Sequence, residues 1–220
     1  MRSALVTGGT GRVGSAIAAR LRHDGWSVVA AGRADGDIAK PDEARALVDR
    51  AAEELGGLDL LVNAAGEGFV AKPAEELTEA DWDAAFGATA KGSFFVTQAA
   101  APHLRASRGC VVMIEDVAAY QPWPSFAAHC AAKAAQAMLT RVLARALAPE
   151  VRVCGIAPGS VAVDPEQEER RAAETLLGRV GSPEDVAAAV VYLAGASFVT
   201  GTTLVVDGGR LLQSASHRIP

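Results

Sequence analysis

The sequence predicts an α/β protein with a parallel β-sheet that is covered by helices on both faces. Two observations lead to this fold class. Short apolar runs rich in β-branched residues alternate with longer stretches of helical period, which is the pattern of consecutive βαβ units. The short runs are also continuously apolar, as expected for strands that are buried on both faces.

The elements can be placed in order along the chain. Six apolar runs are expected as strands, at Ser3–Thr7, Ser27–Ala31, Leu58–Val62, Cys110–Ile114, Val151–Ile156 and Thr203–Val206. The Ala-, Glu- and Arg-rich stretches between them are expected as helices, at Val13–Arg22, Pro41–Leu55, Glu79–Leu104, Ser125–Leu147 and Pro183–Leu193. A seventh, very short strand is considered at Asp37–Ile38. No stretch has the composition of a linker or repeat, so residues 1–220 are expected to form one domain.

Composition narrows the class of protein. The chain has 220 residues, half of them hydrophobic, and a net charge of −5, which argues against a nucleic-acid or anionic-membrane surface. Its three cysteines form no cluster with metal-ligand spacing, which favours reduced thiols and no metal. No signal peptide and no apolar stretch of membrane-spanning length is visible. We therefore expect a soluble cytoplasmic protein.

A glycine-rich turn, in the segment VTGGTGRVGSAIAARL, joins the first expected strand to the first helix. Its glycines allow a tight turn, close approach of the backbone to a pyrophosphate and close packing of helix on sheet. An ordinary strand–helix turn could carry the same glycines, and only the position after the first strand favours a nucleotide site. The candidate cofactor-binding residues here are Gly8, Thr10, Gly11, Arg12, Val13 and Gly14.

Further candidate residues follow later strands, at the carboxyl edge where open α/β sheets bind ligands. The segment LDLLVNAAG ends in Asn63, Ala64, Ala65 and Gly66, and RVCGIAPGSV contains Pro158, Gly159 and Val161. Together with FVTGTTLVVDGG, these segments make the chain similar to the short-chain dehydrogenase/reductase family from residue 3 to about residue 210. The resemblance implies a Rossmann-like, doubly wound sheet, a bound NAD(H) or NADP(H), and a homodimer or homotetramer.

The choice of cofactor is predicted from charge. An acidic residue after the second strand would bind the ribose diol of NAD, but the segment VVAAGR has Gly32 and Arg33 there. Arg12 in the glycine-rich turn offers a second guanidinium group for a 2′-phosphate. Asp37 and Ile38 match the family's acid–aliphatic pair that lines the adenine. We therefore expect NADP(H), the alternative being that Arg33 is a solvated loop residue and Arg12 an ordinary first-turn side chain.

The segment SFAAHCAAKAAQ places His129 and Lys133 one helical turn apart on the same face. In the family this helix carries Tyr-x-x-x-Lys, whose tyrosine exchanges a proton with the substrate and whose lysine holds the nicotinamide ribose. The resemblance thus puts His129 in the tyrosine's place and retains Lys133. It also puts Asp116 in the place of the family's serine and Thr89 in that of its asparagine. Arginine in the glycine-rich turn and aspartate for serine resemble the pteridine reductase subgroup, which keeps its tyrosine.

Three functions remain open at this stage. The first is an NADP(H)-dependent reductase of a ketone, imine or pterin-like heterocycle, in which His129 donates the proton and Asp116 favours its charged form. The second is non-redox catalysis on the same scaffold, such as cyclisation or dehydration, and the third is a cofactor-binding pseudoenzyme. The span GSVAVDPEQEERRAAETLL is expected to form a small lid, with Val161 and Val163 inward and its Glu/Arg run in water. This short lid favours a compact polar substrate over a long acyl or steroid one.

Overall fold

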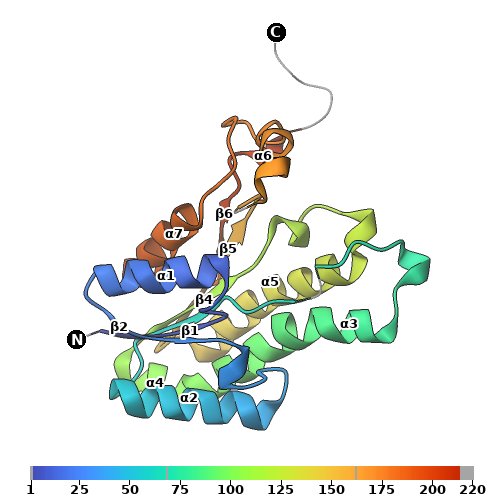
Figure 1. Ribbon diagram of the computed structural model, residues 1–220. Coiled ribbons are helices and arrows are strands. Elements are labelled where there is room, and N and C mark those ends of the chain that lie inside the picture. The colour runs from blue at the N-terminus through green and yellow to red at the C-terminus, as the bar shows by residue number, and fades with distance from the viewer. Residues whose placement is uncertain (1, 68, 162, 214–220) are drawn as a thin grey trace.

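The computed structural model describes residues 2–67, 69–161 and 163–213, and its centre is a parallel sheet with helices on both faces (Figure 1). The six strands lie in the order β2-β1-β3-β4-β5-β6. Their bounds are β1 Ser3–Thr7, β2 Ser27–Ala31, β3 Leu60–Asn63, β4 Cys110–Ile114, β5 Arg152–Pro158 and β6 Thr203–Val206. The predicted fold class is confirmed, because the chain winds outward from β1 in both directions, as in a Rossmann-like fold.

Helices cover the two faces of the sheet unequally. On one face lie α1 (Arg12–His23) and α7 (Pro183–Gly195), and on the other lie α2 (Pro41–Leu55), α4 (Ser93–Ser107) and α5 (Ala127–Leu147) (Figure 1). Short helices complete the chain: α3 Glu79–Phe86, α6 Pro165–Ala172, a π-helical segment at Gly87–Gly92, and 3-10 turns at Arg33–Asp35, Ala74–Glu76, Val117–Ala119, Pro124–Phe126 and Arg210–Leu212. None of the described helices is long and apolar enough to cross a bilayer.

The strands form the core because both of their faces are covered. Leu5, Leu61, Val111 and Val153 pack under α2, α4 and α5 and have no exposed surface. The alternate strand residues pack under α1 and α7 in the same way. Burial of each such side chain contributes ~1.5–3 kcal/mol to folding. The sheet is therefore a rigid frame, and its carboxyl edge holds the loops that follow each strand.

The seventh strand considered at Asp37–Ile38 is not formed. The N–H of Asp37 donates to Glu43 Oε2 at 2.7 Å, and the N–H of Lys40 donates to the Asp37 carbonyl oxygen at 2.9 Å. This segment is therefore a turn that leads into α2, and it leaves β2 at the edge of the sheet.

The single helix predicted at Glu79–Leu104 is also wrong, because it is divided by the π-helical segment. A Cβ on Gly92 would lie 2.8 Å from Ile38, so this turn depends on a contact with a distant segment. The π turn holds Thr89 fully inside the protein. Other boundaries differ less. The strand β3 begins two residues later and ends one residue later than predicted, and β5 begins one residue later and ends two residues later. The helix α5 starts at Ala127, after a 3-10 turn.

Candidate active site

The glycine-rich turn is packed so tightly that its glycines have no room for side chains. Gly8 has a φ of +65°, and a Cβ there would lie 2.7 Å from the backbone of Ala64 at the end of β3. A Cβ on Gly14 would lie 2.2 Å from the carbonyl oxygen of Gly8. The turn therefore brings the start of α1 against the loop after β3. A helix N-terminus in this position, where the first N–H groups have no acceptor in the preceding turn of the helix, is suited to a pyrophosphate.

Two cavities open on the carboxyl edge of the sheet. The first has a volume of about 240 Å³ and lies between the glycine-rich turn, the loop after β2 and the loop after β3. The candidate residues that line it are Gly8, Thr10, Gly11, Arg33, Asp37, Ile38, Ala64, Ala65 and Gly66. These come from four separate segments, and the structure brings all of them to one site.

The rim of the first cavity carries an ion pair. Arg33, whose side chain is 70% exposed, contacts the carboxylate of Glu67 from the loop after β3. Glu67 lines both cavities and was not among the residues singled out from the sequence. The N–H of Gly32 donates to Asp35 Oδ2 at 2.8 Å, so this carboxylate caps the turn after β2.

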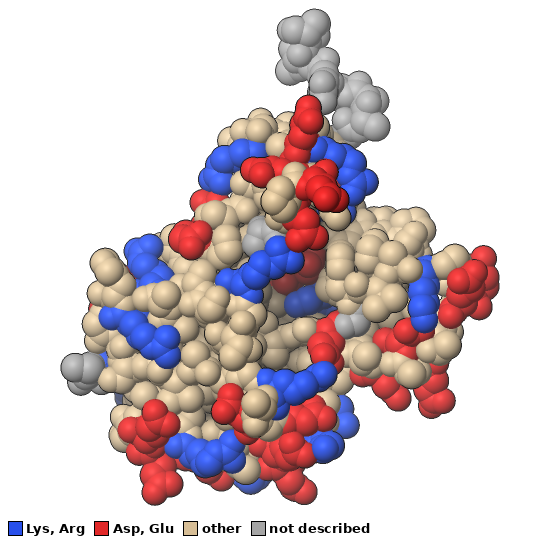
Figure 2. All heavy atoms as spheres, viewed as in Figure 1, with Lys and Arg blue, Asp and Glu red and all other residues tan. Residues whose placement is uncertain are grey.

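The second cavity has a volume of about 710 Å³ and lies between α5, the loop after β5 and the α6 lid. Figure 2 shows a hollow on this face of the molecule, with side chains of both charges around it. Ten candidate residues line it: Arg12, Val13, Ala64, Gly66, Asp116, His129, Lys133, Pro158, Gly159 and Val161. Val163 also lines it, as the lid interpretation expected.

Arg12 does not join Arg33. As the first residue of α1 it lines the second cavity, and its guanidinium group lies 3.4 Å from Asp164 Oδ1 at the start of the lid helix. The two arginines that the sequence suggested as one phosphate site thus line different cavities. Among the described residues that line the first cavity, Arg33 is the one with a positive charge.

His129 is buried in the wall of the second cavity. Its side chain is 8% exposed, and neither ring nitrogen makes a hydrogen bond within the described protein. Nε2 lies 3.5 Å from Asp116 Oδ2, which is close enough for an ion pair but not aligned as a hydrogen bond. The other carboxylate oxygen, Oδ1, accepts from the N–H of Ala118 at 2.8 Å, and this contact fixes the orientation of the Asp116 side chain. A buried polar ring without a partner is costly unless a ligand supplies one.

Lys133 lies one turn further along α5 and is also buried. Its Nζ donates to the carbonyl oxygen of Ile114 at 2.9 Å and to Gln136 Oε1 at 3.1 Å. Burial lowers the pKa of Lys133, while the nearby carboxylates of Asp116 and Glu115 act in the opposite direction. The amine thus lies at the cavity wall, held by two oxygen acceptors.

Glu115 is a second carboxylate of this wall and is only 2% exposed. It accepts hydrogen bonds from the hydroxyl of Thr140 at 2.6 Å and from that of Tyr120 at 3.1 Å. A Cβ on Gly155 would lie 2.0 Å from Glu115 Oε1, so a glycine in β5 makes room for this carboxylate. Burial raises the pKa of Tyr120, and its hydroxyl is directed to Glu115.

Three candidate residues line neither cavity: the buried Gly14 of the glycine-rich turn, Asn63 and Thr89. Asn63 has no exposed surface, and its amide donates to Thr97 Oγ1 at 3.0 Å and to the sulfur of Met113 at 3.3 Å. The hydroxyl of Thr89 is buried without a hydrogen-bond partner in the described protein, and it lies 3.6 Å from where a Cβ on Gly66 would be. Both side chains lie behind the backbone that forms the cavity floor.

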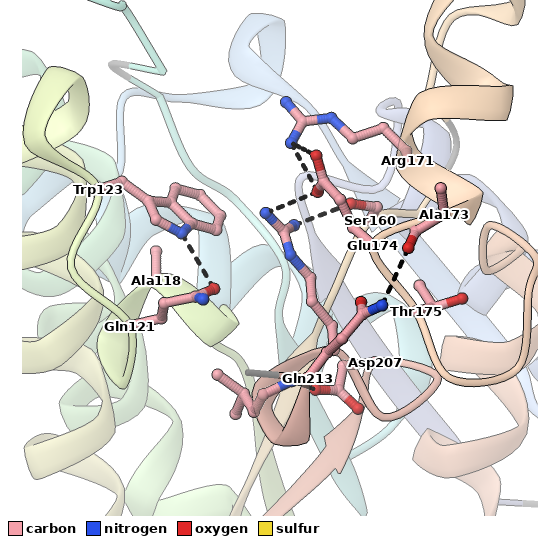
Figure 3. A network of polar contacts seen from close by, with 12 residues as sticks. Ala118, Gln121, Trp123, Ser160, Arg171, Ala173, Glu174, Thr175, Asp207 and Gln213 are labelled. Atoms are coloured by element: carbon pink, nitrogen blue, oxygen red, sulfur yellow. Dashed lines mark hydrogen bonds and ion pairs between the residues drawn. The ribbon is translucent and has the colours of Figure 1, made fainter. Parts of the chain in front are cut away.

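Sequence reasoning missed several residues of the second cavity. Phe69 and Phe126, with Trp123 from the loop before α5, form an aromatic wall around His129. Arg171 lies across from Trp123 (Figure 3), and Arg210 lines the cavity beside Trp123, with its guanidinium carbon 5.0 Å from the centre of that ring. Residues 164–170 of the lid are exposed as predicted, but Arg171 turns inward. No local pattern marks Arg210, which the 3-10 turn at Arg210–Leu212 brings to the site.

A doubly wound sheet with a glycine-rich turn at its switch point defines a dinucleotide-binding α/β protein. Known proteins narrow this class. A family model described as enoyl-(acyl carrier protein) reductase matches residues 19–210. The 3beta-hydroxysteroid dehydrogenase 1 of Eggerthella lenta is 36% identical over 246 aligned residues, which cover 96% of this chain and 94% of that protein. The chain belongs to the short-chain dehydrogenase/reductase family of oxidoreductases, which use nicotinamide cofactors.

Solved structures agree with this assignment. The ligand-free aldohexose dehydrogenase of Thermoplasma acidophilum superposes with a TM-score of 0.91 at 27% identity, covering 100% of this chain and 97% of that one. The 3-ketoacyl-(acyl-carrier-protein) reductase of Brucella melitensis, complexed with NADH, superposes with a TM-score of 0.89 at 28% identity, covering 95% and 98% of the two chains.

Proposed function

We propose that this protein is an NADP(H)-dependent reductase of a carbonyl or imine group, in a ketone or a pterin-like heterocycle, and that His129 is its proton donor. The observation that carries the proposal is the state of His129. The ring is buried in the cavity wall, its two nitrogens have no hydrogen-bond partner in the described protein, and a carboxylate lies 3.5 Å away. A substrate oxygen or nitrogen would complete its hydrogen bonding.

The residues present fit a nicotinamide dinucleotide. The glycine-rich turn leaves no room for a Cβ at Gly8 or Gly14, and its backbone can therefore meet a pyrophosphate closely. Asp37 and Ile38 line the first cavity where an adenine would lie, and Lys133 lies in the second cavity where a nicotinamide ribose would be held. When bound in reduced form, the cofactor supplies hydride. The absence of a carboxylate at Gly32 and the presence of Arg33 favour the 2′-phosphorylated form.

Proton transfer is assigned to His129 on chemical grounds. Hydride addition to a carbonyl or imine carbon makes the attached oxygen or nitrogen basic, and a donor must protonate it. Imidazolium serves this purpose near neutral pH. Asp116 Oδ2 lies 3.5 Å from Nε2 of the ring, and the N–H of Ala118 fixes the orientation of this carboxylate. Lys133 lies on the same face of α5 and acts in binding rather than in the transfer itself.

The test separates this function from the two alternatives. Pure protein is mixed with NADPH or NADH, binding is measured by calorimetry, and turnover is followed with a panel of ketones, aldehydes, imines and oxidised pterins. We expect binding with oxidation of NADPH in the parent, and loss of turnover with binding retained in His129→Phe. The matched control is Met138→Ala, an exposed position on the same helix.

Each other outcome contradicts the proposal in a defined way. Product formation without oxidation of the cofactor would indicate non-redox catalysis such as cyclisation or dehydration. Cofactor binding without any product across the panel would indicate a pseudoenzyme. Unaltered turnover in His129→Phe would show that another group donates the proton.

A further inference from the structure

We propose that the substrate is a planar ring compound that carries an anionic group as well as the reducible one, and that Arg210 binds the anion. This inference rests on the proposed reductase function, and it deepens that function by naming the substrate class. Arg210 is a specificity-determining residue in this account, because it would contact the substrate at the end remote from His129.

Arg210 is held in the wall of the second cavity although its side chain is only 12% exposed. Its Nη1 donates to Ser160 Oγ at 2.9 Å, and its Nη2 lies 3.0 Å from Glu174 Oε2. Its guanidinium carbon lies 5.0 Å from the centre of the Trp123 ring. An arginine has five N–H donors, and these contacts occupy only some of them. They also fix the planar guanidinium group in the cavity wall.

The charges around Arg210 do not balance. Glu174 pairs with Arg210 and also with Arg171, whose Nη1 lies 3.1 Å from the same Oε2 (Figure 3). Two guanidinium groups thus share one carboxylate, and the cluster keeps one net positive charge. The remaining arginine of this cavity, Arg12, already faces Asp164 at 3.4 Å. A buried charge favours a partner of opposite sign, and a substrate carboxylate, sulfonate or phosphate would supply it with forked geometry.

Flat rings lie beside both Arg210 and His129 in the wall of the second cavity. The indole of Trp123 lies nearly parallel to the imidazole, at 7° and 6.4 Å between ring centres. Phe69 and Phe126 stack on each other at 4.5 Å beside them. Because the indole centre lies 5.0 Å from the guanidinium carbon and 6.4 Å from the imidazole, those two groups are no more than about 11 Å apart. Aromatic walls favour a planar ring, and one ring with substituents on opposite sides can reach both ends.

The experiment compares two matched probes. With NADPH present, reduction of 4-carboxybenzaldehyde is compared with that of its methyl ester, which has the same ring and aldehyde but no charge. We expect kcat/KM for the acid to exceed that for the ester by ~10-fold or more, as for a charge-assisted contact. In Arg210→Gln this advantage should disappear, while the ester is reduced as before. In Glu174→Gln it should increase, because the competing carboxylate is gone.

Arg170→Gln is the matched control, since Arg170 lies beside Arg171 on the lid helix but is exposed and does not line the cavity. Equal kcat/KM for acid and ester in the parent would overturn the proposal. An Arg210→Gln variant that loses both substrates equally would also overturn it, because that pattern indicates a structural role. Thermal melting of each variant, and Arg171→Gln as a second variant, guard against misfolding.

A binding measurement separates this inference from the proposed function. Benzoate and benzamide, neither of which is reduced, are added to the protein–NADPH complex, and binding is followed by ligand-observed NMR. Preference for benzoate that is lost in Arg210→Gln supports the anion site even if no aldehyde is reduced. No preference for benzoate overturns the anion site even if the ester is a good substrate.

Discussion

Replacement of Arg33 by alanine tests the cofactor assignment directly. A charge-assisted hydrogen bond contributes ~1.5–3 kcal/mol where it is shielded from solvent. The Arg33 side chain is 70% exposed, and we therefore expect the lower value that solvent screening allows, ~1 kcal/mol, or about fivefold in Kd. NADPH should bind about fivefold more weakly to Arg33→Ala, whereas NADH, which has no 2′-phosphate, should bind as before. Calorimetry at two salt concentrations checks the origin of the loss, because screening by salt reduces an exposed electrostatic contact.

Two further variants sharpen this test. Glu67 pairs with Arg33 at the cavity rim and would compete with a 2′-phosphate, so Glu67→Gln should strengthen NADPH binding without affecting NADH. Arg12 lines the other cavity, so Arg12→Ala should leave the preference between the two cofactors unchanged. If Arg33→Ala weakens both cofactors equally, or if the parent binds NADH as well as NADPH, the assignment of the 2′-phosphate site is refuted.

Three other predictions concern the site. His129→Ala should lose ~10²–10⁴-fold in turnover, the usual contribution of a general acid, with NADPH affinity retained, and unaltered turnover would contradict this. Lys133→Met should weaken NADPH in calorimetry. Because burial lowers the pKa of Lys133, the unfolded chain holds more protons than the folded one between that lowered value and the ordinary 10.5. Urea titrations should therefore show the stability of the parent, relative to Lys133→Met, rising with pH through that window. Gly14→Ala, which would place a methyl group 2.2 Å from the Gly8 carbonyl oxygen, should abolish cofactor binding and lower the melting temperature, whereas the open Gly178→Ala site carries only the strain of its positive φ.

The sheet could be predicted because buried parallel strands leave a strong local signal. Ser3–Thr7 and Cys110–Ile114 are continuous apolar runs, and both form strands at the predicted bounds. The division of the predicted helix at Glu79–Leu104 could not be predicted, because it depends on the contact between Gly92 and Ile38, and these residues are far apart in sequence. Local sequence patterns indicate which residues are buried and whether a segment has helical or strand periodicity. They do not indicate which distant segment packs against a turn.

The candidate site likewise has some residues that the sequence predicts and others that it does not. His129 and Lys133 share a helix face because of their spacing, and their common position at the second cavity follows from periodicity. Arg171 and Arg210 come from the lid and from the end of the chain, and only the folded structure brings them to one carboxylate. The direction of Arg12 likewise depended on Asp164, a residue of the distant lid.

Because of the π-helical turn at Gly87–Gly92, the position of Thr89 depends on the number of residues between α3 and α4 as well as on their identity. Such a turn closes its hydrogen bonds over one residue more than an α-helical turn, and each residue of an α-helix advances the rotation by ~100°. Deletion of one residue here would let α3 run directly into α4, and would rotate Thr89 away from Gly66 while α4 kept its packing on the sheet. Gain or loss of a single residue is thus a route by which this scaffold can redirect a buried hydroxyl during evolution, without a substitution at any residue that lines the second cavity.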